Sequence, residues 1–214
     1  MNHTPQVKRS NYEFEKYSSE GRFTSYYWQL KEVIACNPQS ILEVGVGDHV
    51  FGSFIKNNTH IEYTSIDIAE DLHPDVVGSI LDLPFADKSF DVVCAFEVPE
   101  HLPFDQFDRA VSELCRVASI YIVISLPHFG PMLSFSVKIP FFPQIRAALK
   151  IPFPVKHIFN GQHHWELGKL GYPASRIRNA LSVRGKIVRD FVPFGNPYHH
   201  FFILQLRDEV QKTS

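Results

Sequence analysis

The chain has 214 residues, of which 44% are hydrophobic and 21% are charged, and its formal net charge is -2. This length and composition fit a single domain over 1–214, and the lack of a basic excess predicts no binding to nucleic acid. Three cysteines without a Cys-x-x-Cys pair exclude a disulfide framework and a thiolate metal site, and they predict a cytoplasmic location.

The first half of the chain predicts alternating strands and helices. Residues 1–22 are polar, lack the apolar core of a signal peptide and predict an N-terminal arm. An apolar stripe then predicts a helix over 24–37, with Thr24 as its N-cap. Strands are expected over 40–46, 61–69, 90–98 and 121–127, and helices over 49–57 and 105–118, the latter capped by Asp105. This alternation indicates an α/β sandwich around a parallel sheet.

The second half departs from this alternation. Residues 128–172 are rich in Pro, Phe and His and show no clear period. A helix is expected over 175–183, and two strands joined at Gly-Asn-Pro are expected within 186–208. The parallel sheet is therefore predicted to end in an antiparallel hairpin.

A glycine-rich turn follows the first predicted strand. Gly45 and Gly47 come directly after "LEV", where bare backbone can approach a ligand. A dinucleotide fingerprint would need its third glycine at Val50, so a nicotinamide-dependent oxidoreductase fits poorly. Asp67 ends the next strand, where a carboxylate can accept both hydroxyls of a ribose.

Four segments in order, "LEVGVG", "IDIA", "LDLPFADKSFDVV" and "FEVPEH", resemble the class I S-adenosylmethionine-dependent methyltransferases, especially the type 11 subgroup. The resemblance covers roughly residues 40–126. It implies a doubly wound Rossmann-like fold: a seven-stranded, mostly parallel sheet with a C-terminal antiparallel hairpin and helices on both faces. It also implies S-adenosylmethionine as the cofactor. His49 stands where that family often has a third glycine.

The resemblance implies cofactor-binding roles at matching positions. Glu43, Gly45 and Gly47 would form the loop around the methionine part, Asp67 would bind the ribose, and Ile68 would lie against the adenine. Asp82 would accept from the adenine amino group, Leu83 would offer its backbone amide to the ring, and Phe96 and Glu97 would line the methionine side. Tyr12, Tyr17 and Arg22 of the arm are candidates to fold over the cofactor carboxylate.

The segment 128–172 emerges where a doubly wound sheet binds its ligands, so we expect it to form the acceptor pocket or a lid. His128, His163 and His164 are candidate general bases, because an imidazole titrates near neutrality. His101 is expected to be a packing residue, and His199 and His200 are expected to face opposite sides of a strand, one of them toward solvent. No metal site is predicted, because "QHHWE" lacks a recognised ligand spacing.

The expected activity is methyl transfer to an O or N atom of a small-molecule or glycan/lipid-linked acceptor. Aromatic and basic residues within 131–158 also suggest contact with a membrane surface. The alternative is a protein that binds S-adenosylmethionine without transferase activity, such as a regulatory or scaffold subunit. The oligomeric state cannot be predicted from the sequence.

Overall fold

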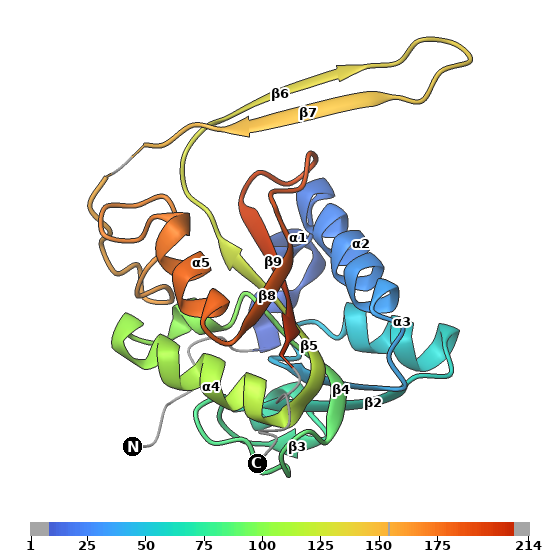
Figure 1. The fold of residues 1–214 in the computed structure, drawn as a ribbon, viewed down its shortest axis with the longest axis vertical. Helices are drawn as coiled ribbons and strands as arrows, with labels where there is room; N and C mark the ends of the chain where they lie inside the picture. The colour runs from blue at the N-terminus through green and yellow to red at the C-terminus, as the bar shows by residue number, and fades with distance from the viewer. Residues whose placement is uncertain (1–8, 154, 208–214) are drawn as a thin grey trace, which may run out of the picture.

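The computed structural model describes residues 9–153 and 155–207, so the beginning of the predicted arm lies outside it. Figure 1 shows a central sheet between two layers of helices. The helices are α1 (Phe14–Tyr17), α2 (Glu20–Ala35), α3 (Val50–Asn58), α4 (Phe107–Val117) and α5 (Ala174–Ser182). Short 3-10 turns are η1 (Arg9–Tyr12), η2 (Glu70–Leu72), η3 (Pro99–His101) and η4 (Phe104–Gln106).

The main sheet has seven strands in the order β3-β2-β1-β4-β5-β9-β8. They are β1 (Ser40–Val44), β2 (Glu62–Asp67), β3 (Val76–Val77), β4 (Phe90–Phe96), β5 (Ala118–Pro127), β8 (Gly185–Phe191) and β9 (His199–Leu206). The strands β1 to β5 are parallel, while β9 runs antiparallel to β5 and β8 antiparallel to β9. The predicted doubly wound sheet with a C-terminal antiparallel hairpin is confirmed.

Side chains of the central strands alternate between two apolar layers. Along β4, Val93 and Ala95 pack with helices α4 and α5, whereas Val92 and Cys94 pack with α2 and α3. Both faces of the strand are therefore buried, which explains its nearly continuous apolar sequence. The carboxyl ends of β1, β2 and β4 lie at one edge of the sheet, where the connecting loops leave space for a ligand.

Two predicted helix starts are wrong. Helix α2 begins earlier than expected, because Ser19 rather than Thr24 is its N-cap and its hydroxyl accepts the Arg22 amide at 3.1 Å. The end of the predicted arm therefore belongs to α2. Asp105 lies in η4, and Gln106 takes the N-cap position of α4 without a side-chain cap bond.

The segment 128–172 contains two different structures. Strands β6 (Met132–Val137) and β7 (Ile145–Lys150) form a separate antiparallel hairpin above the main sheet (Figure 1). Further on, Trp165 and Leu167 are fully buried in the layer of α4 and α5, and the Trp165 indole donates to the Leu102 carbonyl at 3.0 Å. This second part is core structure and not a detachable lid.

Candidate active site

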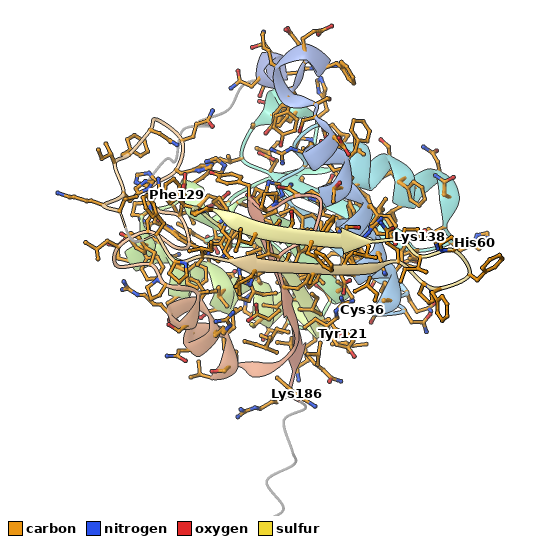
Figure 2. The ribbon with its side chains drawn as sticks, turned by 90° about the horizontal axis from the view of Figure 1, so that it is seen from above. Cys36, His60, Tyr121, Phe129, Lys138 and Lys186 are labelled. Carbon is orange, nitrogen blue, oxygen red and sulfur yellow. The ribbon has the colours of Figure 1, made fainter. Side chains whose placement is uncertain are left out.

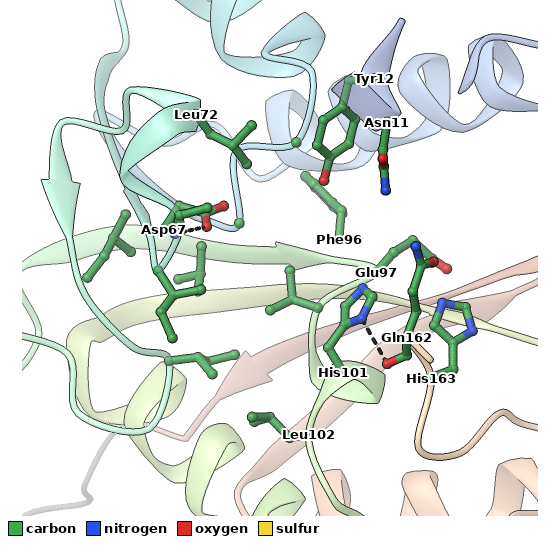
Figure 3. Close-up of a pocket in the computed structure, with 18 of the residues that line it drawn as sticks. Asn11, Tyr12, Asp67, Leu72, Phe96, Glu97, His101, Leu102, Gln162 and His163 are labelled. Atoms are coloured by element: carbon green, nitrogen blue, oxygen red, sulfur yellow. Dashed lines mark hydrogen bonds between the residues drawn. The ribbon is translucent and has the colours of Figure 1, made fainter. Parts of the chain in front are cut away.

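A cavity of about 630 Å³ opens at the carboxyl ends of β1, β2 and β4. Figure 3 shows Asp67 and Leu72 at one end, with His101 and His163 at the other. Its walls come from seven parts of the chain: 11–12, 16–17 and 22; 44, 45 and 47; 66–69 and 72; 78–80; 96–98, 101 and 102; 162–163; and 198–199. The sheet edge, the N-terminal helices and the segment after the β6–β7 hairpin thus meet around one space.

The loop after β1 needs glycine at its first turn. Gly45 has φ +85°, and a Cβ built on it would lie 2.3 Å from Val98 Cγ2. Gly47 has φ +50° and also lines the cavity. His49, at the third position of the motif, keeps the left-handed conformation at φ +64° although it carries a side chain. Its ring contacts the Leu72 carbonyl, so the loop keeps a glycine-like path without the third glycine.

Glu43 lies beneath this loop and outside the cavity wall. It is 3% exposed, and the Tyr63 hydroxyl donates to its carboxylate. Burial raises the pKa of Glu43 to about 8, against the lowering effect of the Tyr63 hydrogen bond. The structure therefore assigns Glu43 a place in the support of the loop and not in direct contact with a ligand.

Asp67 faces the cavity with its carboxylate fixed in place. One oxygen accepts the Val46 amide at 2.9 Å and the other accepts the Ala69 amide at 2.8 Å. Burial raises the pKa of Asp67, and these amides partly offset the effect. Each oxygen keeps a further lone pair for a ligand hydroxyl, and the neighbouring Ile68 lines the same wall.

The structure does not bring Asp82 and Leu83, which the resemblance predicts at the adenine, to the cavity wall. The Asp82 side chain is exposed, and the Leu83 amide already donates to Glu113 Oε2 at 2.8 Å. Neither residue lines the cavity; Ser79 and Ile80 do, three residues earlier. The turn before "LPF" brings residues 78–80 to the cavity and leaves the Asp82 side chain exposed.

Phe96 and Glu97 both reach the cavity at the end of β4. Glu97 has φ +56°, a strained conformation of the kind that collects at functional sites. Its Oε2 lies 3.5 Å from His199 Nε2, and its Oε1 has no hydrogen-bond partner in the described ranges. Burial raises the pKa of Glu97 to about 7.

Of the three candidate bases, only His163 reaches the cavity. His128 lies outside it and pairs with His200, their Nδ1 atoms 2.8 Å apart. His164 turns toward Phe159, with ring centroids 4.6 Å apart. The structure therefore does not support His128 or His164 as a base.

Two other histidines line the cavity although the sequence predicted structural roles for them. His101 donates from Nδ1 to the Gln162 carbonyl at 3.2 Å. Burial, with His163 nearby, lowers the pKa of His101 to about 4. His199 is buried with His200, because β9 has packed layers on both faces and neither side chain meets solvent. Burial lowers the pKa of His199 to about 3. The position of His101 in "EVPEH", directly after β4, is the sequence feature that could have placed it at the cavity.

Tyr12, Tyr17 and Arg22 also line the cavity, as predicted for the arm. The Arg22 guanidinium lies 4.2 Å from the Tyr17 ring centroid. The cavity therefore has a cationic group in its wall, in addition to the carboxylates.

Comparisons with known proteins agree with this architecture. Residues 42–119 match the family model of a methyltransferase domain. A comparison with curated proteins finds no significant match. The sugar N-methyltransferase KedS8 from Streptoalloteichus is 12% identical, with 97% of this chain and 96% of that one covered at a TM-score of 0.63.

Two further solved structures contain bound molecules. The 1,6-didemethyltoxoflavin-N1-methyltransferase of Burkholderia thailandensis, with 1,6-didemethyltoxoflavin and S-adenosylhomocysteine, is 12% identical; 93% of this chain and 85% of that one are covered, and the TM-score is 0.60. The magnesium protoporphyrin IX methyltransferase of Synechocystis, with S-adenosylhomocysteine, is also 12% identical, with coverages of 96% and 90% and a TM-score of 0.60.

Residues 42–119 match the model of a methyltransferase domain, and the chain shares its fold with solved methyltransferases, two of which hold S-adenosylhomocysteine and one of which is by its name a sugar N-methyltransferase. The match falls within residues 40–126, where the sequence motifs predict a methyltransferase domain of the type 11 subgroup.

Proposed function

We propose that the protein transfers a methyl group from S-adenosylmethionine to an O or N atom of a small-molecule acceptor bound beside His101 and His163. The observation that carries this proposal is the continuity of the cavity. One space connects the Asp67 carboxylate to a second polar end formed by residues 97, 101, 162–163 and 198–199. Such a space suits two ligands that must meet at their reacting atoms.

The cavity residues fit the cofactor's chemistry. We propose that Asp67 accepts the ribose hydroxyls and that Ile68 and Ile80 flank the adenine. Gly45 and Gly47 allow the backbone to approach the methionine part, and Arg22 is a charge partner for its carboxylate. The cofactor, when bound, supplies an electrophilic methyl group whose bond to sulfur breaks as the acceptor atom attacks, leaving the electron pair on sulfur.

The chain's own residues position and protect the reactants. Tyr12 and Tyr17, from the N-terminal helices, cover one wall of the cavity and exclude water. His163 is held by Glu166, whose Oε1 lies 3.1 Å from its Nδ1, and Tyr198 donates to the same oxygen at 3.1 Å. We propose that His163 holds the acceptor and takes its proton when the acceptor is protonated at working pH.

Calorimetric titration with S-adenosylhomocysteine tests the cofactor assignment. Asp67→Ala should weaken binding at least about 10-fold, because charge-assisted hydrogen bonds contribute roughly 1.5–3 kcal/mol. Glu70→Ala, an exposed acid three residues further on, is the matched control. Equal affinities for wild type and Asp67→Ala would refute the proposal, whereas binding without turnover on any acceptor would favour the alternative of a cofactor-binding protein.

The β6–β7 hairpin supports a finer proposal, that the acceptor is lipid-linked and that the protein docks on an anionic membrane. Cross-strand neighbours share a face of a hairpin. The pairs Leu133↔Leu149, Phe135↔Ala147 and Val137↔Ile145 place apolar side chains on one face, while Ser136↔Arg146 and Met132↔Lys150 lie on the other.

The polar face points toward the body of the molecule. Lys150 Nζ donates to the His128 and Pro197 carbonyls at 2.6 and 2.7 Å, and the Arg146 guanidinium lies 5.5 Å from the Phe194 ring centroid. The apolar face is exposed, as is Phe141 near the tip. Figure 2 shows the hairpin lying across the body of the molecule, with Phe129 and Lys138 labelled toward its two ends.

Charge selects an anionic surface as the partner. Residues 128–160 contain four basic side chains, Lys138, Arg146, Lys150 and Lys156, and no Asp or Glu. Arg146 and Lys150 lie on the face toward the body, so Lys138 and the exposed Lys156 are the charges available to a membrane. Basic groups near an anionic bilayer contribute about 1 kcal/mol each. Among the helices of the described ranges, none is long and apolar enough to cross a bilayer, so the proposal concerns surface docking.

Vesicle co-sedimentation tests this docking. Wild type should bind phosphatidylglycerol vesicles more strongly than phosphatidylcholine vesicles and lose binding at high salt. Phe135→Ser with Phe141→Ser should abolish sedimentation, whereas Val183→Ser, an equally exposed apolar residue at the end of α5, should not. Sedimentation that is independent of lipid charge or of the hairpin residues would overturn the proposal.

A further inference from the structure

Three possible metal ligands converge at the acceptor end of the cavity. One ligand atom each from Glu100, His101 and His163 lies within 4.8 Å of the others. Figure 3 shows the two histidine rings side by side, away from Asp67. Ligands about 2.1 Å from a common ion lie roughly 3.4 Å apart in a tetrahedral site, so small side-chain rotations would close the set.

The Glu100 carboxyl group is buried and has two oxygens that could bind a cation. The residue is 0% exposed, and within the ranges that the structure describes neither of its oxygens has a hydrogen-bond partner. A buried carboxyl group whose oxygens make no hydrogen bond is costly in free energy. A metal ion held by this carboxylate and the two imidazoles would remove that cost.

The fold brings these distant residues together through three hydrogen bonds. The His164 amide donates to the Glu100 carbonyl at 2.9 Å, the His101 ring bonds the Gln162 carbonyl, and the Trp165 indole donates to the Leu102 carbonyl. These bonds hold the segment 162–165 against η3 and fix His163 beside Glu100. The cluster is therefore a built part of the structure.

Both rings are also held as metal-binding histidines usually are. His163 Nδ1 pairs with the Glu166 carboxylate, and Lys169 Nζ binds the other oxygen of that carboxylate at 3.0 Å. His101 Nδ1 pairs with a backbone carbonyl. A carboxylate or carbonyl behind the imidazole sets the ring orientation and strengthens the opposite nitrogen as a ligand.

We propose that Glu100, His101 and His163 bind one divalent first-row transition-metal ion, of the zinc or cobalt type, at the acceptor end of the cavity. Two imidazoles and one carboxylate are a common donor set for such ions, and three protein ligands leave a coordination position open.

The role of this metal site in catalysis rests on the proposed function, since the metal ion would act on the methyl acceptor. An acceptor hydroxyl in the open position would have a lowered pKa. With the metal bound, His163 would be a ligand and not the base, so the hydroxyl proton would leave to solvent. The bound oxygen would then form the new bond to the methyl carbon as the bond from that carbon to sulfur breaks. The acceptor class is therefore an alcohol or phenol, and the reaction is an O-methylation.

The metal-binding test uses the full chain after treatment with a chelator. Titration with Zn²⁺ by calorimetry should show one site per chain. His101→Ala and His163→Ala should each weaken it at least about 10-fold, and Glu100→Gln, which keeps the shape of the side chain, should also weaken it. Co²⁺ should give visible absorption bands that disappear in the same variants. His164→Ala is the matched control and should bind both ions as wild type does.

Titration of the same variants with S-adenosylhomocysteine separates the two proposals and reports folding. His163→Ala should lose Zn²⁺ but keep S-adenosylhomocysteine, and Asp67→Ala should do the reverse. Zn²⁺ binding to wild type no tighter than to a His101→Ala, His163→Ala double variant would overturn the metal site. An equal loss of Zn²⁺ affinity in His164→Ala would also overturn the metal site. If wild type binds Zn²⁺ but does not bind S-adenosylhomocysteine, the proposed function alone is overturned.

Discussion

The buried acid Glu43 should make the stability of the ligand-free protein depend on pH. Its pKa is raised from 4.5 in the unfolded chain to about 8 in the folded one. Between these values the folded state holds a proton that the unfolded state has lost. The stabilising contribution is therefore present below about pH 4.5 and disappears as pH rises through about 8.

The magnitude follows from the difference in bound protons. One proton changes the free energy of unfolding by about 1.4 kcal/mol per pH unit. Between about pH 5.5 and about 7.5, Glu43 alone should lower it by roughly 3 kcal/mol. Since a domain of this size loses about 2–4 °C in Tm per kcal/mol, the corresponding shift is about 6–12 °C.

Glu43→Gln should remove this dependence, because the amide keeps the shape and can still bond the Tyr63 hydroxyl. Thermal unfolding of wild type and Glu43→Gln between about pH 5.5 and about 7.5 gives the difference in Tm at each pH. The contributions of the other titratable groups are common to both proteins and cancel in this difference. The charged or titratable groups that also influence this site are Asp48, Lys56, Asp67 and Cys94. Glu62→Gln, an exposed acid on β2, is the control. Parallel Tm curves for wild type and Glu43→Gln would refute the reasoning.

Three further predictions concern the loop after β1, the core and the cavity wall. Gly45→Ala places a Cβ 2.3 Å from Val98 Cγ2 at φ +85°, and should weaken S-adenosylhomocysteine binding at least about 10-fold by calorimetry. Trp165→Ala removes a fully buried indole and should cost about 3–5 kcal/mol in chemical denaturation. Arg22→Ala should raise the KM for S-adenosylmethionine about 10-fold with a smaller change in kcat, because its charge acts on binding rather than on the reacting atoms.

Each of these has a contrary outcome. Gly171 has φ +88° but open space around it, so Gly171→Ala should leave the affinity for S-adenosylhomocysteine unchanged. If Gly171→Ala and Gly45→Ala weaken this affinity equally, the close contact with Val98 is not the cause. A Trp165→Ala protein as stable as wild type would contradict the assignment of that segment to the core. A loss of kcat alone in Arg22→Ala would exclude a role in cofactor binding.

The sequence predicts the main sheet well because its strands are buried on both faces. A nearly continuous apolar segment such as 121–127 can be satisfied only as a strand buried on both faces. The alternation of such strands with helices then predicts a parallel sheet. The β6–β7 hairpin escapes the same reasoning, since both of its faces are largely exposed and burial imposes no period on it. Ser19 was overlooked as a cap because the first turn of α2 carries few apolar residues.

The candidate site was predictable only where a motif is local. Gly45, Gly47 and Asp67 follow from their positions at strand ends, and all three line the cavity. The pairing of His101 with His163 was not visible, because hydrogen bonds between segments about 60 residues apart create it. The prediction that one of His199 and His200 faces solvent is wrong. Side chains that alternate along a strand reach solvent only where one face of the sheet is uncovered, and both faces of β9 are covered.

The β6–β7 hairpin has a consequence for how this protein can diverge. Its strands are hydrogen-bonded to each other and, in the described part of the chain, to no strand of the main sheet. Changes along its strands therefore leave the folding of the main sheet largely untouched. Descendants, or designed chimeras, can exchange this one module while they inherit an unaltered main sheet.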